Sequence, residues 1–277
     1  MKNEVYCSTG AVIGRVTGYD HTVIRTLLPY VCKNAGADGI EHVFISPYYE
    51  KLDEVRRTIA DSGLRCAVLH ADKNIGSLLS NGIDADTDEA FRLWEINCAE
   101  AVRLGAERIV FHLWGMPASD RNFAANLAAM PRIVEIADAH GLKLMIENIP
   151  SLASDPVSRW RELESFGCSF TYDVRFGQLH GQNGIIPTCE YAENGRISHI
   201  HISDFGGETL DFSKIRPILH PGEGKVDFPS VFDGLKKSGY AGSFTLESPV
   251  MYETGLDADK LECTLSWLCR EVKERLS

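Results

Sequence analysis

Apolar residues follow two patterns of spacing along this chain, and segments with the two patterns alternate from one end to the other. Short apolar runs bounded by glycine, proline or small polar residues have the length of buried strands, whereas longer segments repeat apolar residues at the three- and four-residue spacing of a helix. The strand-like runs cover residues 5–13, 39–45, 64–71, 108–114, 142–149, 168–176, 198–205 and 242–248. The helix-like segments cover residues 22–34, 49–61, 87–104, 122–139, 158–166, 228–238 and 256–276, with only a short turn expected near 188–192.

This alternation predicts the fold class. Eight strand-like runs with intervening helices are what a closed parallel (β/α)8 TIM barrel requires, and the 277 residues suit a single TIM-barrel domain over residues 1–277. An open doubly wound sheet is the alternative, but no Gly-x-Gly-x-x-Gly motif opens a helix, which disfavours its nucleotide-binding form. Residues 72–86, after the third strand, are interpreted as a loop that covers the barrel mouth or packs on another subunit.

Composition limits the cellular compartment and the classes of binding partner that are expected for the protein. The net charge of -11 disfavours binding to nucleic acid, which usually needs a basic surface. The 8 cysteines include no Cys-x-x-Cys pair and lie mostly in predicted strands and helices, as expected for reduced thiols in a cytoplasmic protein rather than disulfides. No apolar run approaches the ~18 residues of a membrane span, and the N-terminus has no apolar signal core, so no membrane partner is expected.

Six polar residues stand near the ends of strands three to eight. Glu147 is the clearest case, because an ionised carboxylate in the apolar run 143–150 is costly unless a cation or hydrogen bonds compensate it. Side chains late in the strands of a TIM barrel converge at the C-terminal face, where such barrels have their active sites. We therefore expect one site that contains His70, His112, Glu147, Asp173, His201 and Glu247.

Two interpretations of the acids stay open. Two glutamates, one aspartate and one histidine form an oxygen-rich donor set, which suits Mn²⁺, Mg²⁺ or Co²⁺ better than a structural zinc ion held by thiolates. Alternatively, the acids pair with arginine or lysine inside the barrel, and Arg175 is a nearby partner for Asp173 unless it contacts a substrate anion. His199 lies deeper in its strand than His201 and is interpreted as a hydrogen-bonded core histidine.

Five motifs in a fixed order give a more specific resemblance. They are Met145-Ile-Glu147-Asn, Tyr172-Asp173, His199-Ile-His201-Ile-Ser-Asp204, Pro221-Gly-Glu-Gly-Lys-Val-Asp-Phe228 and Thr245-Leu-Glu247. Over nearly its whole length the chain resembles the sugar phosphate isomerase/epimerase superfamily, also called xylose isomerase-like TIM barrels. Ketose 3-epimerases, inosose dehydratases, hydroxypyruvate isomerases and endonuclease IV share this pattern.

The resemblance implies a set of metal ligands and a mechanism. A divalent ion, with Mn²⁺ expected first and Mg²⁺, Co²⁺ or Zn²⁺ as alternatives, would be bound by Glu147, Asp173, His201 and Glu247. Such an ion acidifies the C–H beside a sugar carbonyl, and Glu147 and Glu247 would be the acid/base pair that removes and returns the proton.

The resemblance also implies contacts to the substrate around this centre. Trp114 is expected to form a stacking wall, and a solvated loop charge is the alternative for Lys73. The full set of expected substrate contacts is His70, Lys73, His112, Trp114 and Arg175.

The sequence departs from the ketose 3-epimerases at two substrate contacts. Those enzymes carry a histidine shortly after the strand-six aspartate, where this chain has Phe176, and an arginine beyond the strand-seven histidine, where it has Gly206 and Gly207. Endonuclease IV also needs that histidine, so DNA repair is disfavoured. The loop 222–225 contains an acid and does not resemble a tight phosphate cradle, so phosphorylation of the sugar is left open.

Three functions remain as hypotheses. The first is a metal-dependent isomerase or epimerase of a sugar or sugar phosphate that acts through an enediolate. The second is a lyase or dehydratase of a keto sugar, inosose or 3-keto glycoside, in which the same anion expels a β-leaving group. The third is a non-catalytic sugar-binding subunit, which would leave the acid/base pair unexplained. A small-molecule carbohydrate is the expected partner in each case, and the oligomeric state is left open, with a homo-oligomer as one option.

Overall fold

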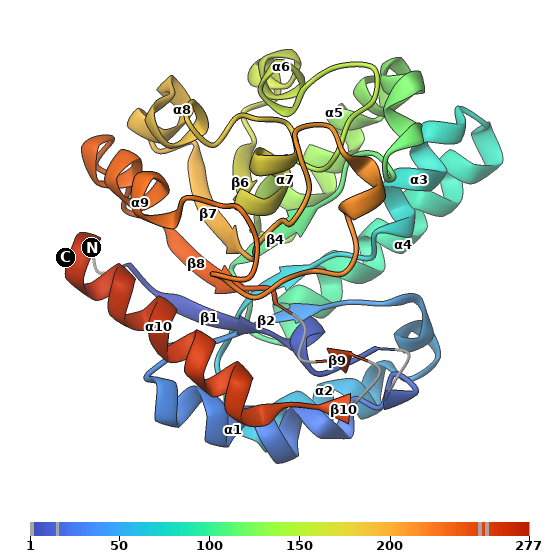
Figure 1. The fold of residues 1–277 in the computed structure, drawn as a ribbon. Coiled ribbons are helices and arrows are strands. Elements are labelled where there is room, and N and C mark those ends of the chain that lie inside the picture. Colours follow the sequence, from blue (N-terminus) through green and yellow to red (C-terminus); the bar gives the residue numbers. More distant parts are fainter. Residues whose placement is uncertain (1–2, 15–16, 249–250, 253–254, 277) are drawn as a thin grey trace.

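Eight parallel strands follow one another in chain order and close into a barrel, because β1 pairs with both β2 and β8 (Figure 1). The computed structural model describes residues 3–14, 17–248, 251–252 and 255–276. The barrel strands are β1 Val5–Ser8, β2 Gly39–Val43, β3 Cys66–His70, β4 Arg108–Phe111, β5 Lys143–Glu147, β6 Ser169–Asp173, β7 Ile197–Ile202 and β8 Ser243–Leu246. The predicted (β/α)8 TIM barrel is confirmed.

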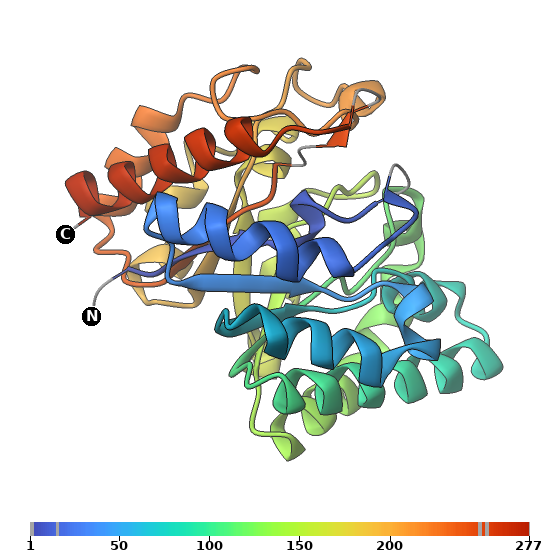
Figure 2. The ribbon, with the colours of Figure 1, turned by 90° about the horizontal axis from the view of Figure 1, so that it is seen from below.

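Helices cover the outside of the barrel (Figures 1 and 2). They are α1 Thr22–Ala35, α2 Leu52–Ser62, α3 Asn74–Asn81, α4 Asp84–Arg103, α5 Phe123–Ala139, α6 Pro156–Glu162, α7 Val174–Leu179, α8 Glu190–Glu193, α9 Phe228–Lys237 and α10 Ala258–Leu276. Helix α10 packs against α1 and α9, so the first and last helices lie side by side. A small antiparallel pair, β9 Met251–Tyr252 and β10 Gly255–Leu256, precedes α10. No described helix is both long and apolar enough to cross a membrane.

The interior of the barrel has an apolar layer beneath a polar one. The apolar layer is a separate buried cluster of Tyr6, Ala67, Val68, Val110 and Met145. Residues two positions apart on a strand face the same side, so the next inward residues, at the ends of β3 and β5 and just after β4, lie one layer nearer the C-terminal face of the barrel. These residues are His70, His112 and Glu147. The apolar cluster is therefore the floor of the predicted site.

The segment after β3 differs from the prediction. Residues 72–86 were interpreted as a loop, but they contain α3 and the start of α4, and α3 packs against α4 and α5. Gly76 lets α3 also approach the backbone that follows β4, because a Cβ atom there would lie 2.1 Å from the backbone oxygen of His112. The helix fixes the β4 end of the barrel mouth, so the loop interpretation was wrong.

Strand β6 is also shorter than the prediction of 168–176. It ends at Asp173, whose side chain accepts a hydrogen bond from the backbone N–H of Phe176 and caps α7. Such a cap satisfies one of the free N–H groups at a helix N-terminus. Arg175 therefore lies in the first turn of α7, and the prediction that the strand continues to residue 176 was wrong.

We expect Gly76→Ala to destabilise the protein by ~1–3 kcal/mol, the usual cost of overpacking a well-packed site, because the added methyl group overlaps the His112 carbonyl. Urea denaturation followed by circular dichroism measures this change. Gly184→Ala is the matched control, since nothing lies within 4 Å of its added methyl group. Equal unfolding midpoints for the two variants would show that Gly76 does not lie against the backbone after β4 as described.

Candidate active site

Four of the polar residues predicted from the strand ends come together at the C-terminal end of the barrel. One potential ligand atom from each lies within 4.8 Å of the others, in the group Glu147, Asp173, His201 and Glu247. The side chain of Glu247 is 10% exposed, whereas those of Glu147, Asp173 and His201 are at most 1% exposed. The group is thus nearly enclosed, with its opening on the Glu247 side.

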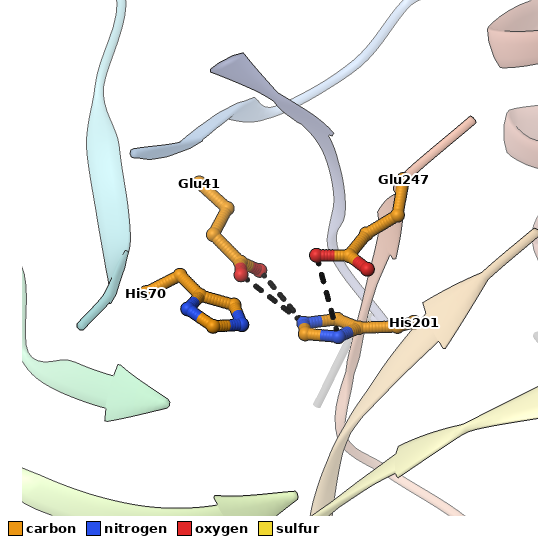
Figure 3. A group of neighbouring side chains, drawn as sticks. All are labelled: Glu41, His70, His201 and Glu247. Atoms are coloured by element: carbon orange, nitrogen blue, oxygen red, sulfur yellow. Dashed lines mark hydrogen bonds and ion pairs between the residues drawn. The ribbon is translucent and has the colours of Figure 1, made fainter. Parts of the chain in front are cut away.

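His201 lies at the centre of the acids, and Figure 3 shows Glu41 and Glu247 directed at its ring. Its Nδ1 is 3.2 Å from Glu147 Oε1 and 3.5 Å from Glu247 Oε1. Its Nε2 is 3.1 Å from Glu41 Oε1 and 3.2 Å from Glu41 Oε2. Burial alone would lower the pKa of His201, but Glu247, Glu41 and Glu147 together raise it well above its usual range. The surroundings of this ring therefore favour positive charge.

Asp173 has one oxygen in use and one without a partner. Oδ1 accepts from the Phe176 N–H at 3.0 Å, while Oδ2 has no hydrogen-bond donor among the described residues. The nearest cation is Arg175, whose Nη2 is 3.8 Å from Oδ2, too far for a hydrogen bond. Burial raises the pKa of Asp173 to about 7, although Arg175 opposes the rise. A buried carboxylate oxygen without a donor is costly, and a bound cation would remove that cost.

The donor set and the free oxygen together fit a divalent metal ion. Three carboxylates and one imidazole are the ligand types that Mn²⁺ and similar ions accept. The alternative interpretation, in which arginine or lysine neutralises the acids, has only one ion pair in its support among the described residues, that of Asp173 with Arg175. Arg175 itself is buried, donates from Nη1 to the backbone oxygen of Ile215 at 3.0 Å, and stacks on the ring of Phe176.

Glu147 is held by histidines on two sides. His112 Nε2 is 2.5 Å and His70 Nε2 is 3.2 Å from Oε2, while His201 approaches Oε1. Burial alone would raise the pKa of Glu147, but His112 and His201 hold it well below its usual range. Burial also lowers the pKa of His112 to about 3, so this ring is a neutral donor to the carboxylate. His70, His112 and Glu147 form a second, overlapping group with metal-ligand spacing.

Glu41 belongs to this site but was missed in the sequence. It is fully buried in β2, and it forms another group with metal-ligand spacing together with His70, His201 and Glu247. The search covered strand ends, whereas Glu41 lies in the middle of its strand. The available signal was the one that identified Glu147, an acid within an apolar strand.

His199 is a hydrogen-bonded core histidine, as predicted. Its Nδ1 lies 2.7 Å from Ser243 Oγ and its Nε2 lies 2.8 Å from Glu41 Oε2. It is fully buried beneath His201 on the same strand.

Two of the expected substrate contacts lie outside this cluster. Trp114 is fully buried, donates its indole N–H to the backbone oxygen of Pro150 at 3.0 Å, and packs edge-on against Phe123. Lys73 is exposed just before α3, and its charge acts on His112. The structure thus gives Trp114 a packing role, and the substrate contacts of both residues stay predictions.

The loop after β7 has no free cradle for a phosphate. Asp204 Oδ2 accepts from the backbone N–H groups of Gly222 and Gly224, both at 2.9 Å, and Oδ1 accepts from those of Phe205 and Val226 at 2.8 and 3.0 Å. Backbone N–H groups of this kind bind anions in other proteins. Here a carboxylate of the chain already occupies them, in agreement with the expectation that 222–225 is not a tight phosphate cradle.

Comparisons with proteins of known sequence find two curated relatives. The uncharacterized protein MJ1311 of Methanocaldococcus jannaschii is 26% identical over 186 residues, which are 59% of this chain and 60% of that protein. The rhizopine catabolism protein MocC of Rhizobium meliloti is 38% identical over 64 residues, 19% of this chain and 20% of that protein. The chain therefore spans less than two thirds of the length of either relative.

Solved structures match over almost the whole chain. D-allulose 3-epimerase from Methylomonas sp., in complex with D-allulose, is 17% identical with a TM-score of 0.72 and coverage of 99% of this chain and 97% of that one. The 3-keto-D-glucoside 4-epimerase YcjR from E. coli is 17% identical, with a TM-score of 0.66 and coverage of 97% and 100%. The IOLI protein with a bound zinc atom is 15% identical, with a TM-score of 0.69 and coverage of 99% of each chain. At these identities the likeness establishes the fold.

The family of the chain follows from a longer match in sequence. The model of the family described as xylose isomerase-like TIM barrel matches residues 29–270. This range contains all four residues of the group formed by Glu147, Asp173, His201 and Glu247. Because the match covers most of the sequence, the chain belongs to the xylose isomerase-like TIM barrel family.

Proposed function

We propose that this protein is a divalent-metal-dependent isomerase or epimerase of a sugar. The observation that carries the proposal is the convergence of Glu147, Asp173, His201 and Glu247 within 4.8 Å at the mouth of the barrel. The D-allulose and 3-keto-D-glucoside epimerases share this fold, which supports the same class of reaction. They also favour an epimerase or isomerase over the lyase alternative, because the activity stated for both of them is epimerisation.

The same four residues would hold the metal ion. The free Oδ2 of Asp173 and the carboxylates around His201 Nδ1 support binding of a hard divalent ion, and we propose Mn²⁺ first. The solved IOLI protein holds zinc, so Zn²⁺ is the main competitor. A bound ion polarises a sugar carbonyl and its neighbouring hydroxyl, which makes the C–H between them more acidic.

Glu147 and Glu247 are proposed to move the proton. Glu147 is buried and held by His112 at 2.5 Å, so it is ionised and fixed in orientation, as a general base requires. Glu247 comes from the far end of the chain, follows β8, and is the more exposed of the two. Since β5 and β8 are separated by two strands, the carboxylates approach the centre from different directions. One removes the proton from the substrate, and the other returns it to the opposite face or to the adjoining carbon.

The proposed substrate contacts surround this pair. His70 and His112 line the Glu147 side of the group and are nearly fully buried. Lys73 is exposed just before α3, near enough for its charge to act on His112, and we propose that it contacts the substrate. Arg175 and Trp114 are buried, and for these two residues contact with the substrate requires local rearrangement.

We expect the Mn²⁺-loaded protein to exchange deuterium from D₂O into the carbon beside a sugar carbonyl, with the carbon skeleton intact. Proton NMR on a panel of ketoses, ketose phosphates, inososes and 3-keto glycosides measures this exchange and names the substrate class. Release of water or an aglycone would instead assign a lyase. No reaction with any member of the panel, under conditions where the metal is bound, would favour a sugar-binding role.

Glu147→Gln and Glu247→Gln should each lower kcat by at least ~100-fold at saturating Mn²⁺, because the amide cannot accept the proton. Circular dichroism should show folded protein in both cases. Glu100→Gln is the matched control, since Glu100 is equally buried but pairs with Arg56 and Arg103 on the outer helix α4. Full activity of Glu247→Gln would disprove the two-glutamate mechanism.

Asp173→Asn should weaken Mn²⁺ binding by at least ~10-fold, since the loss of a direct ligand costs no less than the loss of an outer partner. Isothermal titration calorimetry of metal-free protein gives the affinity. Asp120→Asn provides the comparison, because Asp120 is also fully buried but bonds the backbone of Leu152 and Ala153 and the side chain of Arg159. Unchanged Mn²⁺ affinity in Asp173→Asn would place the metal elsewhere.

A further inference from the structure

Glu41 is the buried acid that the proposed chemistry leaves without a role. It projects from β2 into the centre of the barrel, is fully buried, and faces the edge of the His201 ring opposite Glu147 and Glu247 (Figure 3). Burial of an ionised carboxylate costs several kcal/mol unless donors surround it. Glu41 must therefore be held by strong partners, and these partners define its orientation.

Two fixed donors hold Glu41 from below. Thr245 Oγ1 donates to Oε2 at 2.7 Å, and His199 Nε2 donates to the same oxygen at 2.8 Å. Both residues are fully buried, on β8 and β7. The carboxylate therefore has little freedom to rotate.

The protonation of His199 follows from the residues behind it. Arg108 Nη1 donates to Ser243 Oγ at 2.5 Å, so the Ser243 hydroxyl proton is free to point at His199 Nδ1, 2.7 Å away. A guanidinium has no acceptor, which fixes the direction of this chain of hydrogen bonds. His199 then carries its proton on Nε2 and donates it to Glu41.

The same reasoning applies to both nitrogens of His201. An ionised carboxylate only accepts hydrogen bonds, so Nε2, 3.1 and 3.2 Å from the two oxygens of Glu41, carries a proton, and without a metal ion so does Nδ1, 3.2 Å from Glu147 Oε1. A metal ion held by Glu147 and Glu247 would replace the proton on Nδ1, and Glu41 would keep the proton on Nε2. Histidine ligands of metals commonly donate their other N–H to a carboxylate, which sets the tautomer and raises the basicity of the ligand.

We propose that Glu41 is the positioning residue of the metal site, which holds His201 with its proton on Nε2 and its Nδ1 directed at the other ligands. The proposal rests on the proposed function, since it assigns a partner to one of the four ligands. Oε2 of Glu41 already accepts from Thr245 and His199, and Oε1, which has no hydrogen bond among the described residues, lies 3.1 Å from His201 Nε2, so we assign Glu41 to His201 rather than to the metal ion.

Metal affinity tests this role without reference to catalysis. Glu41→Gln keeps the shape of the side chain but removes the charge and adds N–H groups, and we expect Mn²⁺ binding to weaken ~10–100-fold in calorimetry. Thr245→Val, which removes one donor to Glu41 and leaves His201 untouched, should weaken binding less and in the same direction. Glu100→Gln removes an equally buried carboxylate far from the site and should bind Mn²⁺ as the wild type does.

The tautomer is tested on the unaltered protein, so the result does not depend on the folding of a variant. In the Zn²⁺-loaded wild type with ¹⁵N-labelled histidine, long-range proton–nitrogen NMR should show the His201 proton on Nε2 and slow exchange of that proton with water. In Glu41→Gln the exchange should be faster, which a purely structural role for Glu41 would not produce.

The outcomes separate the two proposals. If the wild type binds Mn²⁺ and turns over substrate, but Glu41→Gln has the wild-type affinity or the wild-type His201 carries its proton on Nδ1, the role of Glu41 is overturned and the proposed function stands. If the wild type binds no divalent ion, both proposals are overturned. Weaker binding in Glu41→Gln together with an Nε2–H on His201 supports the role of Glu41.

Discussion

The burial of negative charge is the constraint on which the upper half of this barrel depends. Glu41, Glu147 and Asp173 are at most 1% exposed, and Glu247 is 10% exposed. Each such charge loses several kcal/mol of hydration, so each needs compensation from nearby groups. Histidines and a threonine provide it for Glu147 and for Oε2 of Glu41, whereas Oε1 of Glu41, 3.1 Å from His201 Nε2, and Oδ2 of Asp173 have no hydrogen bond among the described residues. Glu41 and Glu147 are thus fixed in orientation by the protein, while Asp173 lacks a donor for one of its two oxygens.

The apolar floor makes this arrangement rigid. The cluster around Val68, Val110 and Met145 fills the lower barrel, so the polar layer cannot relax downward. A single line of polar groups passes beside this floor, from Tyr6 through Arg108 and Ser243 to His199. Arg108 donates to both Tyr6 and Ser243, and from Ser243 the donors continue through His199 to Glu41. The orientation of one histidine at the top of the barrel thereby depends on residues two layers below.

The barrel and its four-residue group could be predicted from sequence because their signals are local and periodic. Strand ends in a parallel barrel converge by topology alone, so Asp173 and His201 could be placed together without knowledge of any contact. Glu41 was not found, because the search covered strand ends, whereas Glu41 lies in the middle of β2. Its partners come from strands far away in the sequence, and no local pattern reveals them.

Helix α3 and the true position of Arg175 could not be predicted for a different reason. The segment 74–81 contains Gly76, two serines and two asparagines, which are weak helix formers, and it is helical because it packs against α4 and α5. Arg175 lies in a helix because Asp173 both ends β6 and caps α7. Because the same residue ends the strand and caps the helix, no loop residues separate β6 from α7, and the sequence does not show where the strand stops.

The pairing of β1 with β8 has a consequence for the order in which the protein can assemble during synthesis. Val5 pairs with Phe244 and Tyr6 with Thr245. Strand β1 is synthesised first, but it cannot pair with its second neighbour until β8, the last barrel strand, has been synthesised. Glu147, Asp173 and His201 are all synthesised before Glu247, and until β8 arrives the acidic interior is open to water on that side. The hydrated, partly open barrel can keep its carboxylates ionised without help, and their desolvation is postponed to the closing step. The complete four-residue group therefore exists only once β8 has joined β1 and β7.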